Sequence, residues 1–295
     1  MTKAERHNLL KGLAFLSPWL IGFSVFMLLP VVLSFYFSLC DYTLLQPPLF
    51  RGTENYRSLA QDPVFWGSLS VTGKYALLAL PLGMILALSL SMLLNVRIRG
   101  QSIYRTVIFL PSLVPAVALA MIWLWLYNPK LGLINLGLRH MGISDPPGWL
   151  SDPKWSLPAL VLMSLWGVGN TVIIYLAGLQ DVPTELYEAA DLDGAGILAK
   201  ILHVTLPSIS PVIFFNLIIA LIGTVQQFTL PFIMTPGGQP ARHTYFYTMY
   251  MYDNAFSYLK MGQGSAMAWI QLLIIMALTG LAFWTSRRWV HYQGS

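Results

Sequence analysis

Six long stretches of this chain contain no charged residue, and they constrain its fold more than any other feature. Asp, Glu, Lys and Arg are absent from residues 12–40, 75–96, 106–129, 155–180, 201–241 and 261–286. A helix that spans a bilayer needs about 20 consecutive, mostly apolar residues. Each charge at the bilayer centre would cost about 2.5–3.5 kcal/mol on insertion scales. The sequence therefore predicts an all-α integral membrane protein with six transmembrane helices.

The charge-free stretches set the expected bounds of the helices. These lie near residues 13–37, 72–95, 104–127, 156–179, 210–234 and 265–287. The stretch 201–241 is expected to hold one helix, because Pro207 and Pro211 interrupt its start and Pro236-Gly237-Gly238 closes its end. We expect one transmembrane domain at 13–287, with short tails at 1–12 and 288–295.

Composition excludes other classes of protein. Only 10% of the 295 residues are charged and 56% are hydrophobic, whereas a soluble domain carries about 25% charged residues. A soluble globular enzyme and a disordered chain are both excluded on this ground. We attribute the net charge of +5 to the basic loops of a membrane protein rather than to contact with nucleic acid. The one cysteine, Cys40, excludes a disulfide framework.

Basic residues predict the orientation of the helices. They gather before the first span, between the second and third, and after the last: Lys3, Arg6, Lys11, Arg97, Arg99, Arg105, Arg287 and Arg288. Loops rich in Lys and Arg remain in the cytoplasm. We therefore expect both termini in the cytoplasm. The opposite loops are longer, and acids largely offset their basic residues.

No motif in the sequence indicates a catalytic, nucleotide or metal site. The segment from Gly67 to Tyr75 has five residues between its glycines, where a phosphate-binding loop has four, and Tyr75 stands where that loop carries Ser or Thr. The five histidines are scattered, and Asp191–Gly194 lacks the spacing of a calcium loop. We expect no enzyme activity, no metal and no cofactor bound by this chain.

The connection at 180–210 is acidic, although it lies on the predicted cytoplasmic side. Pro183-Thr184 predicts a helix start with Thr184 as N-cap, and Gly194 suits a left-handed cap at the end of that helix. A second short helix is expected over Ile197–Val204, ended by Leu206-Pro207. A helix pair outside the membrane suits contact with another protein. An ordinary amphipathic loop at the membrane surface would have the same composition.

This connection also carries a recognisable motif. Glu188-Ala189-Ala190, then Asp193-Gly194-Ala195 and Leu206-Pro207, resembles the EAA loop of ABC importer permeases, with Ile201 where Phe is commoner and Val204 where Ile is commoner. Further segments resemble binding-protein-dependent permeases of the MalF- and UgpA-like carbohydrate uptake family: Phe15–Phe23, Asn55-Tyr56, Arg99-Gly100, Gly132–Asn135, Thr235–Gly238 and Met261-Gly262.

The resemblance implies a type I ABC importer transmembrane domain that forms half of a translocation pathway for a carbohydrate or a related polyol or glycerol phosphate. It implies as partners two ATPase subunits that bind ATP and Mg, a second EAA-bearing permease, commonly a different chain, and an extracytoplasmic solute-binding protein. Residues 180–210 would couple to the ATPase through Glu188, Ala189, Ala190, Asp193, Gly194, Ala195, Leu206 and Pro207. The expected location is the cytoplasmic membrane of a bacterium or archaeon, in contact with lipid.

Polar residues on the helices that flank this loop are candidates for the solute pathway. They are Trp166, Asn170, Thr224, Gln226 and Gln227. Side-chain amides both donate and accept hydrogen bonds, as sugar hydroxyls do, and an indole can stack on a sugar face. The same residue types also bond transmembrane helices to one another, so both roles stay open.

A self-sufficient secondary transporter or channel is the alternative from another class. Such a protein commonly shows an internal inverted repeat or an ionisable residue inside the membrane. The sequence shows no such repeat, and Lys74, the charge nearest to a span, is expected at the outer interface. These features favour the importer subunit.

Overall fold

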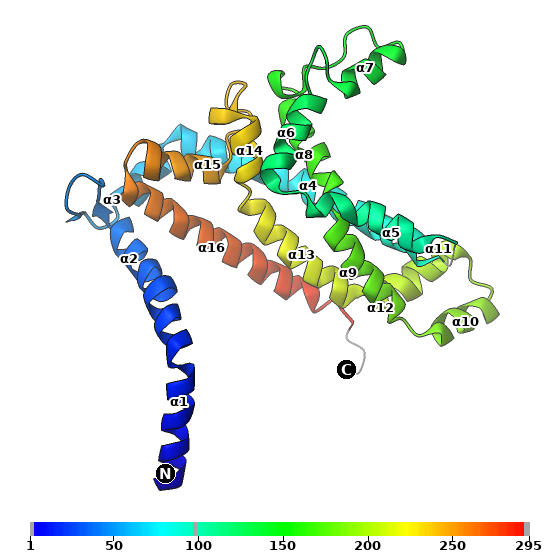
Figure 1. The fold of residues 1–295 in the computed structure, drawn as a ribbon, viewed down its shortest axis with the longest axis horizontal. Helices are drawn as coiled ribbons and strands as arrows, with labels where there is room; N and C mark the ends of the chain where they lie inside the picture. The colour runs from blue at the N-terminus through cyan, green and yellow to red at the C-terminus, as the bar shows by residue number, and fades with distance from the viewer. Residues whose placement is uncertain (1–2, 97–98, 292–295) are drawn as a thin grey trace. The chain divides into compact units, whose positions relative to one another are not determined.

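The computed structural model describes residues 3–96 and 99–291, without the side chains of residues 3–5, 9 and 10. Arg97, one of the basic residues used to predict the orientation, and the end of the 288–295 tail lie outside this description. The described chain forms helices and one pair of two-residue strands. Figure 1 labels the helices, and the contacts of the chain divide it into two compact units. Unit 1 comprises Met1–Asp62 and Met251–Leu273, and unit 2 comprises Pro63–Tyr250 and Ile274–Ser295.

Unit 1 is built around a long N-terminal helix and the start of the C-terminal helix. Its elements are α1 (Lys3–Phe23), a π-helical turn η1 (Ser24–Leu28), α2 (Leu29–Ser38), β1 (Cys40–Asp41), β2 (Leu49–Phe50), α3 (Glu54–Gln61), a second π-helical turn η6 (Asp253–Ser257) and the first half of α16 (Met261–Ser286). The two strands pair antiparallel, with Cys40 opposite Phe50.

The junction after α2 explains two of the segments that carry the family resemblance. The Asn55 side-chain amide donates to the carbonyls of Ser38 and Cys40, both at 2.8 Å, and so satisfies groups left open where α2 ends. The N–H of Gly262 donates to the Tyr42 carbonyl at 3.0 Å. A Cβ at Gly262 would lie 2.3 Å from the Cys40 carbonyl oxygen, so glycine allows this approach.

Unit 2 holds the remaining elements. They are α4 (Pro63–Asn95), α5 (Gln101–Phe109), η2 (Leu110–Leu113), α6 (Ala116–Leu126), α7 (Leu133–His140), η3 (Trp149–Ser151), α8 (Ser156–Trp166), α9 (Gly169–Gln180), α10 (Thr184–Leu192), α11 (Ile197–Lys200), η4 (Ile201–Thr205), α12 (Leu206–Ser208), α13 (Ser210–Val225), α14 (Thr229–Met234) and η5 (Pro236–Gly238). The short helix α15 (Tyr247–Tyr252) and the long α16 cross the division between the units.

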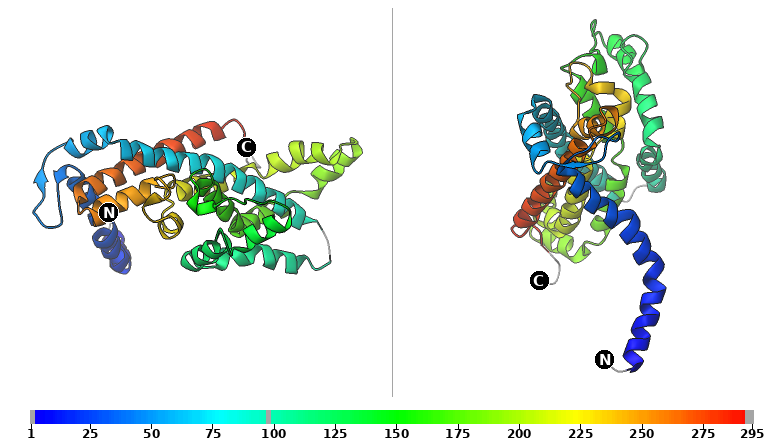
Figure 2. Two further views of the ribbon diagram at one scale, coloured as in Figure 1. Left: turned by 90° about the horizontal axis from the view of Figure 1, so that it is seen from above. Right: turned by 90° about the vertical axis from the view of Figure 1, so that its left-hand side faces the viewer.

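Helix α4 is the organising element of unit 2. It packs against α8, α9 and α13 and runs lengthwise through the unit (Figure 2). Ala87, Val172 and Tyr175 are fully buried at the contact between α4 and α9. Glycine brings α9 and α13 close together, because a Cβ at Gly178 would lie 2.8 Å from the Val212 side chain.

Four helices of the described residues are long and apolar enough to cross a membrane. They are Arg6–Ser38, Pro63–Asn95, Ser210–Met234 and Met261–Ser286. Two further candidates are helix pairs bent at a break: Gln101–Leu113 with Ala116–Leu126 at 98°, and Ser156–Trp166 with Gly169–Gln180 at 48°. The expectation of single helices at 104–127 and 156–179 is therefore corrected to two broken ones. The 210–234 segment also has a short gap between α13 and α14.

Proline accounts for the sharper break. Val114 is extended, with ψ of 125°, because the residue before a proline is pushed out of the helical region, and Pro115 then precedes α6. The second break falls at Gly167 and Val168. Each break leaves backbone N–H and C=O groups without partners from their own helix. Inside a membrane such groups occur where protein or a water-filled cavity covers them.

Candidate functional site

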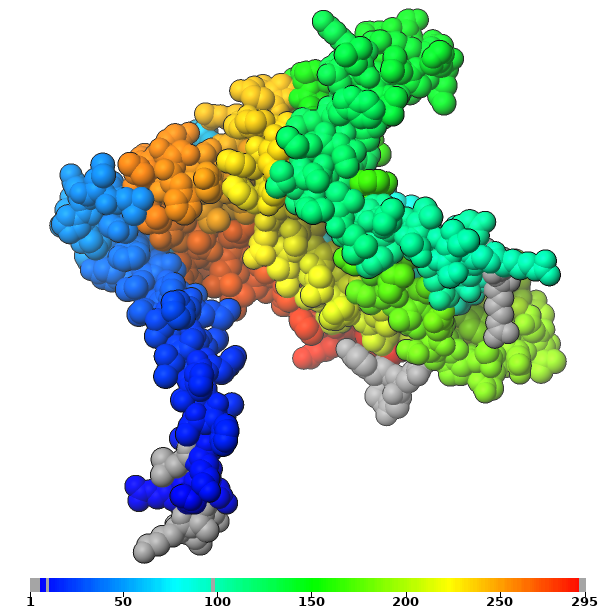
Figure 3. Space-filling view, in the orientation of Figure 1, coloured from blue at the N-terminus to red at the C-terminus, as the bar shows by residue number. Residues whose placement is uncertain are grey.

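The acidic connection between α9 and α13 emerges at one end of unit 2 (Figure 1). The α6–α8 connection, which contains α7, lies at the opposite end of the unit. Figure 3 shows the first of these connections, in yellow-green, on the surface at the lower right of the view. The acidic loop that carries the motif therefore lies at one end of unit 2, and the α6–α8 connection lies at the other.

The first arm of this loop is α10, and a complete cap ends it. Gly194 has φ of +73°, its N–H bonds to the Asp191 carbonyl at 3.0 Å, and the Ala195 N–H bonds to the Ala190 carbonyl at 2.9 Å. This is the Schellman arrangement, in which a left-handed residue satisfies the last carbonyls of a helix. The predicted cap at Gly194 is confirmed. The prediction of Thr184 as N-cap was wrong, because Pro183 occupies that position and makes no side-chain bond.

The second arm runs from Ile197 to Ser208 as α11, η4 and α12. Leu206-Pro207 does not end it as predicted, since the helix continues through Ser208. The reason is the π-helical turn η4, in which the Leu206 N–H bonds to the Ile201 carbonyl, five residues back. Pro207, near the start of the next helical segment, then needs no N–H of its own.

Two side-chain contacts tie the arms together. The Tyr187 and Thr205 hydroxyls are 3.0 Å apart and share a hydrogen bond, and Lys200 forms an ion pair with Asp191. Apolar side chains are exposed where the two arms meet: Leu192 at the end of α10 is 91% accessible, and Ile197 and Leu198 at the start of α11 are 81% and 70% accessible. The loop is thus braced across its base and presents an apolar tip, which marks a surface for protein contact.

The other motif residues lie on the same loop with different exposure. Glu188, Ala189, Asp193 and Gly194 are exposed, whereas Ala190, Ala195, Leu206 and Pro207 are half-buried. The structure therefore leaves Glu188 exposed on α10 beside the small Ala189, with Glu185 and Asp193 as further exposed acidic side chains of this loop. The half-buried members of the motif support the shape of the loop.

A polar cavity lies beside the break between α8 and α9. Its volume is about 210 Å³, and α4, the break and α13 enclose it. Hydroxyl groups line it among apolar side chains: Tyr75, Ser164, Thr171 and Thr224. Glycine at 83 and 167 leaves room on the walls. A cavity of this kind can hold water or one part of a hydroxylated ligand.

The structure gathers only one of the five predicted solute-pathway residues at this cavity. Thr224 lines it, with its hydroxyl bonded to the Ala220 carbonyl at 2.5 Å. Trp166, Asn170 and Gln226 are exposed and do not line it. Trp166 packs edge-on against Trp123, with ring centroids 6.1 Å apart. Gln227 is half-buried, and its backbone carbonyl accepts a bond from the Thr248 hydroxyl.

Sequence reasoning missed Tyr75, Ser164 and Thr171 as lining residues. Ser164 and Thr171 are seven residues apart, which places them on one face if the span continues across its break. That spacing was a usable signal. Tyr75 gave no such signal, because its helix is apolar on all sides. A tyrosine near a membrane–water interface is usually interpreted as an anchor of the helix in that interface.

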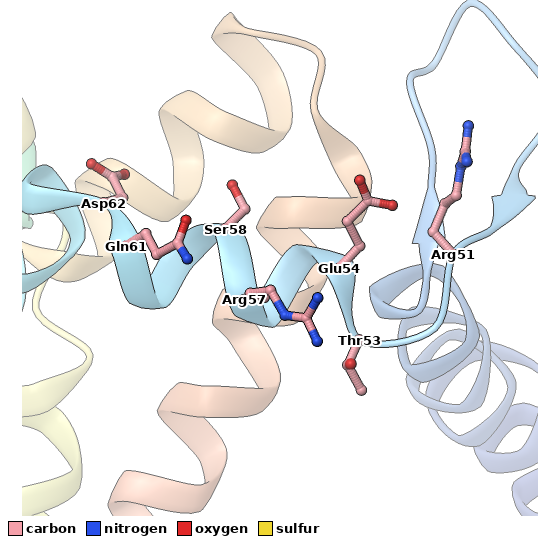
Figure 4. A pocket seen from close by; sticks show the side chains of 7 residues that line it. All are labelled: Arg51, Thr53, Glu54, Arg57, Ser58, Gln61 and Asp62. Carbon is pink, nitrogen blue, oxygen red and sulfur yellow. The ribbon is translucent and has the colours of Figure 1, made fainter.

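A second polar pocket, which sequence reasoning also missed, lies in unit 1 along α3. Its volume is about 530 Å³, and its lining is Arg51, Thr53, Glu54, Arg57, Ser58, Gln61 and Asp62. Glu54, Ser58 and Asp62 project to the same side of the helix, and Arg51 stands on the segment before it (Figure 4). Acids and bases are mixed here, so the pocket has no single preference for ligand charge.

Known proteins match this chain over most of its length. A family described as binding-protein-dependent transport system inner membrane component matches residues 79–291. The probable ABC transporter permease protein YesP of Bacillus subtilis (strain 168) is 37% identical over 295 residues, covering 99% of this chain and 95% of YesP. The lactose transport system permease protein LacF of Rhizobium radiobacter is 33% identical over 289 residues, covering 96% of each chain.

A solved structure shares the fold. It is a bacterial ABC transporter involved in the import of the acidic polysaccharide alginate, with a TM-score of 0.83 and 24% sequence identity over 96% of both chains. The type I permease fold expected from the sequence is therefore confirmed, as is the multi-pass membrane character. The matched region includes the acidic loop and every residue that lines the cavity except Tyr75. This chain belongs to the family of binding-protein-dependent transport system inner membrane components, the membrane permeases of ABC transporters.

Proposed function

We propose that this chain is one permease subunit of an ATP-driven importer of carbohydrates, and that residues 180–210 couple it to a separate ATPase. The observation that carries the proposal is the braced loop at the end of unit 2, with its Schellman cap and exposed apolar tip. Leu192, Ile197 and Leu198 are more exposed than a surface loop in water would favour. Docking into a groove of an ATPase would cover them.

Glu188 would add specificity to that contact. Its carboxylate is exposed on α10, and a basic residue of the ATPase could donate a charge-assisted hydrogen bond to it. Ala189 beside it allows close approach. ATP and Mg would bind to the partner and not to this chain.

The ATPase requirement separates this proposal from a secondary transporter. We expect the tagged chain to co-purify with an ATPase and a second permease from the membrane of its source cell. Liposomes that contain the whole complex, a solute-binding protein and internal ATP should accumulate solute. Liposomes with this chain alone should not. Solute flux through the chain alone, without ATP, would instead support the self-sufficient transporter or channel.

Six spans with both termini in the cytoplasm are part of the proposal. Four continuous helices and two bent pairs supply that number if each pair crosses once. The loop at 180–210 then lies in the cytoplasm, and the connection that contains α7 lies outside. This order agrees with their positions at opposite ends of unit 2.

Thiol labelling tests this orientation. In a Cys40→Ser background, a cysteine at Ser257, which is exposed, should react with an impermeant maleimide in intact cells. A cysteine at Asp193, on the exposed turn after α10, should react only after the membrane is opened. Each variant serves as the control for the other. Labelling of both positions from outside would contradict the six-span arrangement.

A carbohydrate is the proposed solute class. The supporting relatives are LacF, named for lactose, and the trehalose/maltose transport system permease protein MalF of Thermococcus litoralis, which is 32% identical over 91% of this chain. A structural neighbour was solved in complex with a periplasmic protein that holds an alginate pentasaccharide. An extracytoplasmic solute-binding protein is accordingly a proposed partner here.

Removal of polar groups near the proposed pathway should weaken transport partially. We expect Thr224→Val, Asn170→Ala and Gln227→Ala each to lower uptake by about 2- to 12-fold, since a net hydrogen bond contributes about 0.5–1.5 kcal/mol. Uptake is measured against protein abundance over a panel of labelled oligosaccharides. Thr106→Val is the matched control, because its hydroxyl also bonds to a carbonyl four residues back and does not line the cavity. Equal uptake in all four variants would assign these residues to helix packing.

A further inference from the structure

A basic, partly apolar groove runs along the first turns of α4, away from the acidic loop and the polar cavity. Two adjoining hollows of about 400 and 650 Å³ form it, and both include Ser70, Val71, Lys74 and His243. Arg242 lines the first hollow and Lys154 the second. Neither lining contains a carboxylate. The groove therefore presents three cations and a histidine without an acid of its own.

The cations keep their charge available for a ligand. The described residues contain no ion pair that involves Lys74, Lys154 or Arg242. The nearby Asp152 accepts the Lys154 backbone N–H on Oδ1 at 2.9 Å and forms no ion pair with the Lys154 side chain in the described residues. The Arg242 guanidinium lies 5.8 Å from the centre of the Tyr245 ring, a cation–π contact that holds it in place.

The other end of the groove is apolar. Leu77, Leu78, Leu157 and Pro158 line it, and Leu77 is 77% exposed. Lys74 is the last charged residue before the charge-free stretch 75–96. In the proposed membrane orientation the leucines therefore face hydrocarbon, and Lys74, Lys154, Arg242 and His243 stand at the level of the outer headgroups.

We propose that this groove binds an anionic phospholipid of the outer leaflet, with its phosphate between Lys74 and Arg242 and an acyl chain along Leu77 and Leu78. A phospholipid headgroup and a soluble phosphate ion share the chemistry of the phosphate group. A lipid fits better than a soluble anion because the cations adjoin an exposed apolar wall, which an acyl chain can contact and a soluble anion cannot. Only the choice of leaflet rests on the proposed function, since binding itself requires no transport.

Native mass spectrometry of the purified full-length chain tests the proposal. After delipidation in detergent, the chain is titrated with phosphatidylglycerol and, separately, with phosphatidylcholine. We expect tighter binding of phosphatidylglycerol. We expect Lys74→Gln and Arg242→Gln each to weaken that binding about five-fold, and the double variant about 25-fold, by the usual contribution of one cation at an anionic headgroup. Phosphatidylcholine binding should change little.

The control keeps the total charge matched. Lys130→Gln with Lys260→Gln removes two exposed cations that line neither hollow, and it should leave phosphatidylglycerol binding at the wild-type value. The pair Lys74→Arg with Arg242→Lys keeps both charges and should also bind normally. Equal binding by the wild type and the Lys74→Gln/Arg242→Gln variant would overturn the proposal, as would equal losses in the control. Displacement of the lipid by excess inorganic phosphate would show a site for a soluble anion instead.

Discussion

Replacement of Gly194 by valine is expected to lower ATP-driven uptake by at least ten-fold while the membrane helices stay intact. Gly194 has φ of +73°, a conformation that costs a residue with a side chain about 1–2 kcal/mol, and more if it is β-branched. No atom lies within 4 Å of a Cβ at this position, so conformation and not crowding is the cause. To avoid the strain the chain must open the Schellman cap, which moves Leu192 relative to Ile197.

Gly196 offers a matched control for this change. A Cβ there is also free of contacts, but its φ is −70°, which any residue adopts. Gly196→Val should therefore retain most of the uptake. The measurements are uptake in vesicles, abundance in the membrane and recovery of the ATPase by affinity purification. Normal uptake by a Gly194→Val protein that inserts normally and retains its ATPase would remove the main support for the coupling role.

How far the sequence predicted this structure depends on the type of signal. Charge-free stretches located the four long apolar helices and the two bent helix pairs, because exclusion of charge from hydrocarbon applies to every residue of a helix. They did not predict the bends, since a bend depends on single residues such as Pro115 and Gly167 and leaves the apolar pattern unchanged. The sequence also did not show that α4 starts at Pro63, nine residues before the expected bound at 72.

The acidic loop and the polar cavity also differ in how far the sequence predicted them, for a similar reason. The cap at Gly194 was predictable, because its hydrogen bonds join residues close together in the chain. The cavity was not, because its hydroxyl groups come from three segments whose contact depends on packing. Thr224 was found by its residue type, whereas Trp166 has an aromatic partner, Trp123, from a distant helix. Local chemistry was therefore visible in the sequence and tertiary contact was not.

A change of Gly169 to alanine is expected to lower the stability of unit 2 more than any other alanine substitution at the α8–α9 break. Gly169 begins α9 and is buried against the end of α5. A Cβ there would lie 2.8 Å from the Ile108 carbonyl oxygen and 3.0 Å from the Phe109 Cα. Both are backbone atoms, which cannot turn aside as a side chain can. Overpacking of this kind costs about 1–3 kcal/mol.

Gly167 lies at the same break and provides the control for this prediction. A Cβ at Gly167 would meet the Ser164 carbonyl oxygen at 3.7 Å, an ordinary contact, and its φ is −91°. Both alanine variants are compared with the wild type by thermal aggregation in detergent and by abundance in the membrane. Gly169→Ala should aggregate at a clearly lower temperature, and Gly167→Ala should not. Equal midpoints would show that α9 and α5 can move apart at little cost, so that the bend at Gly167 and Val168 is not fixed by this contact.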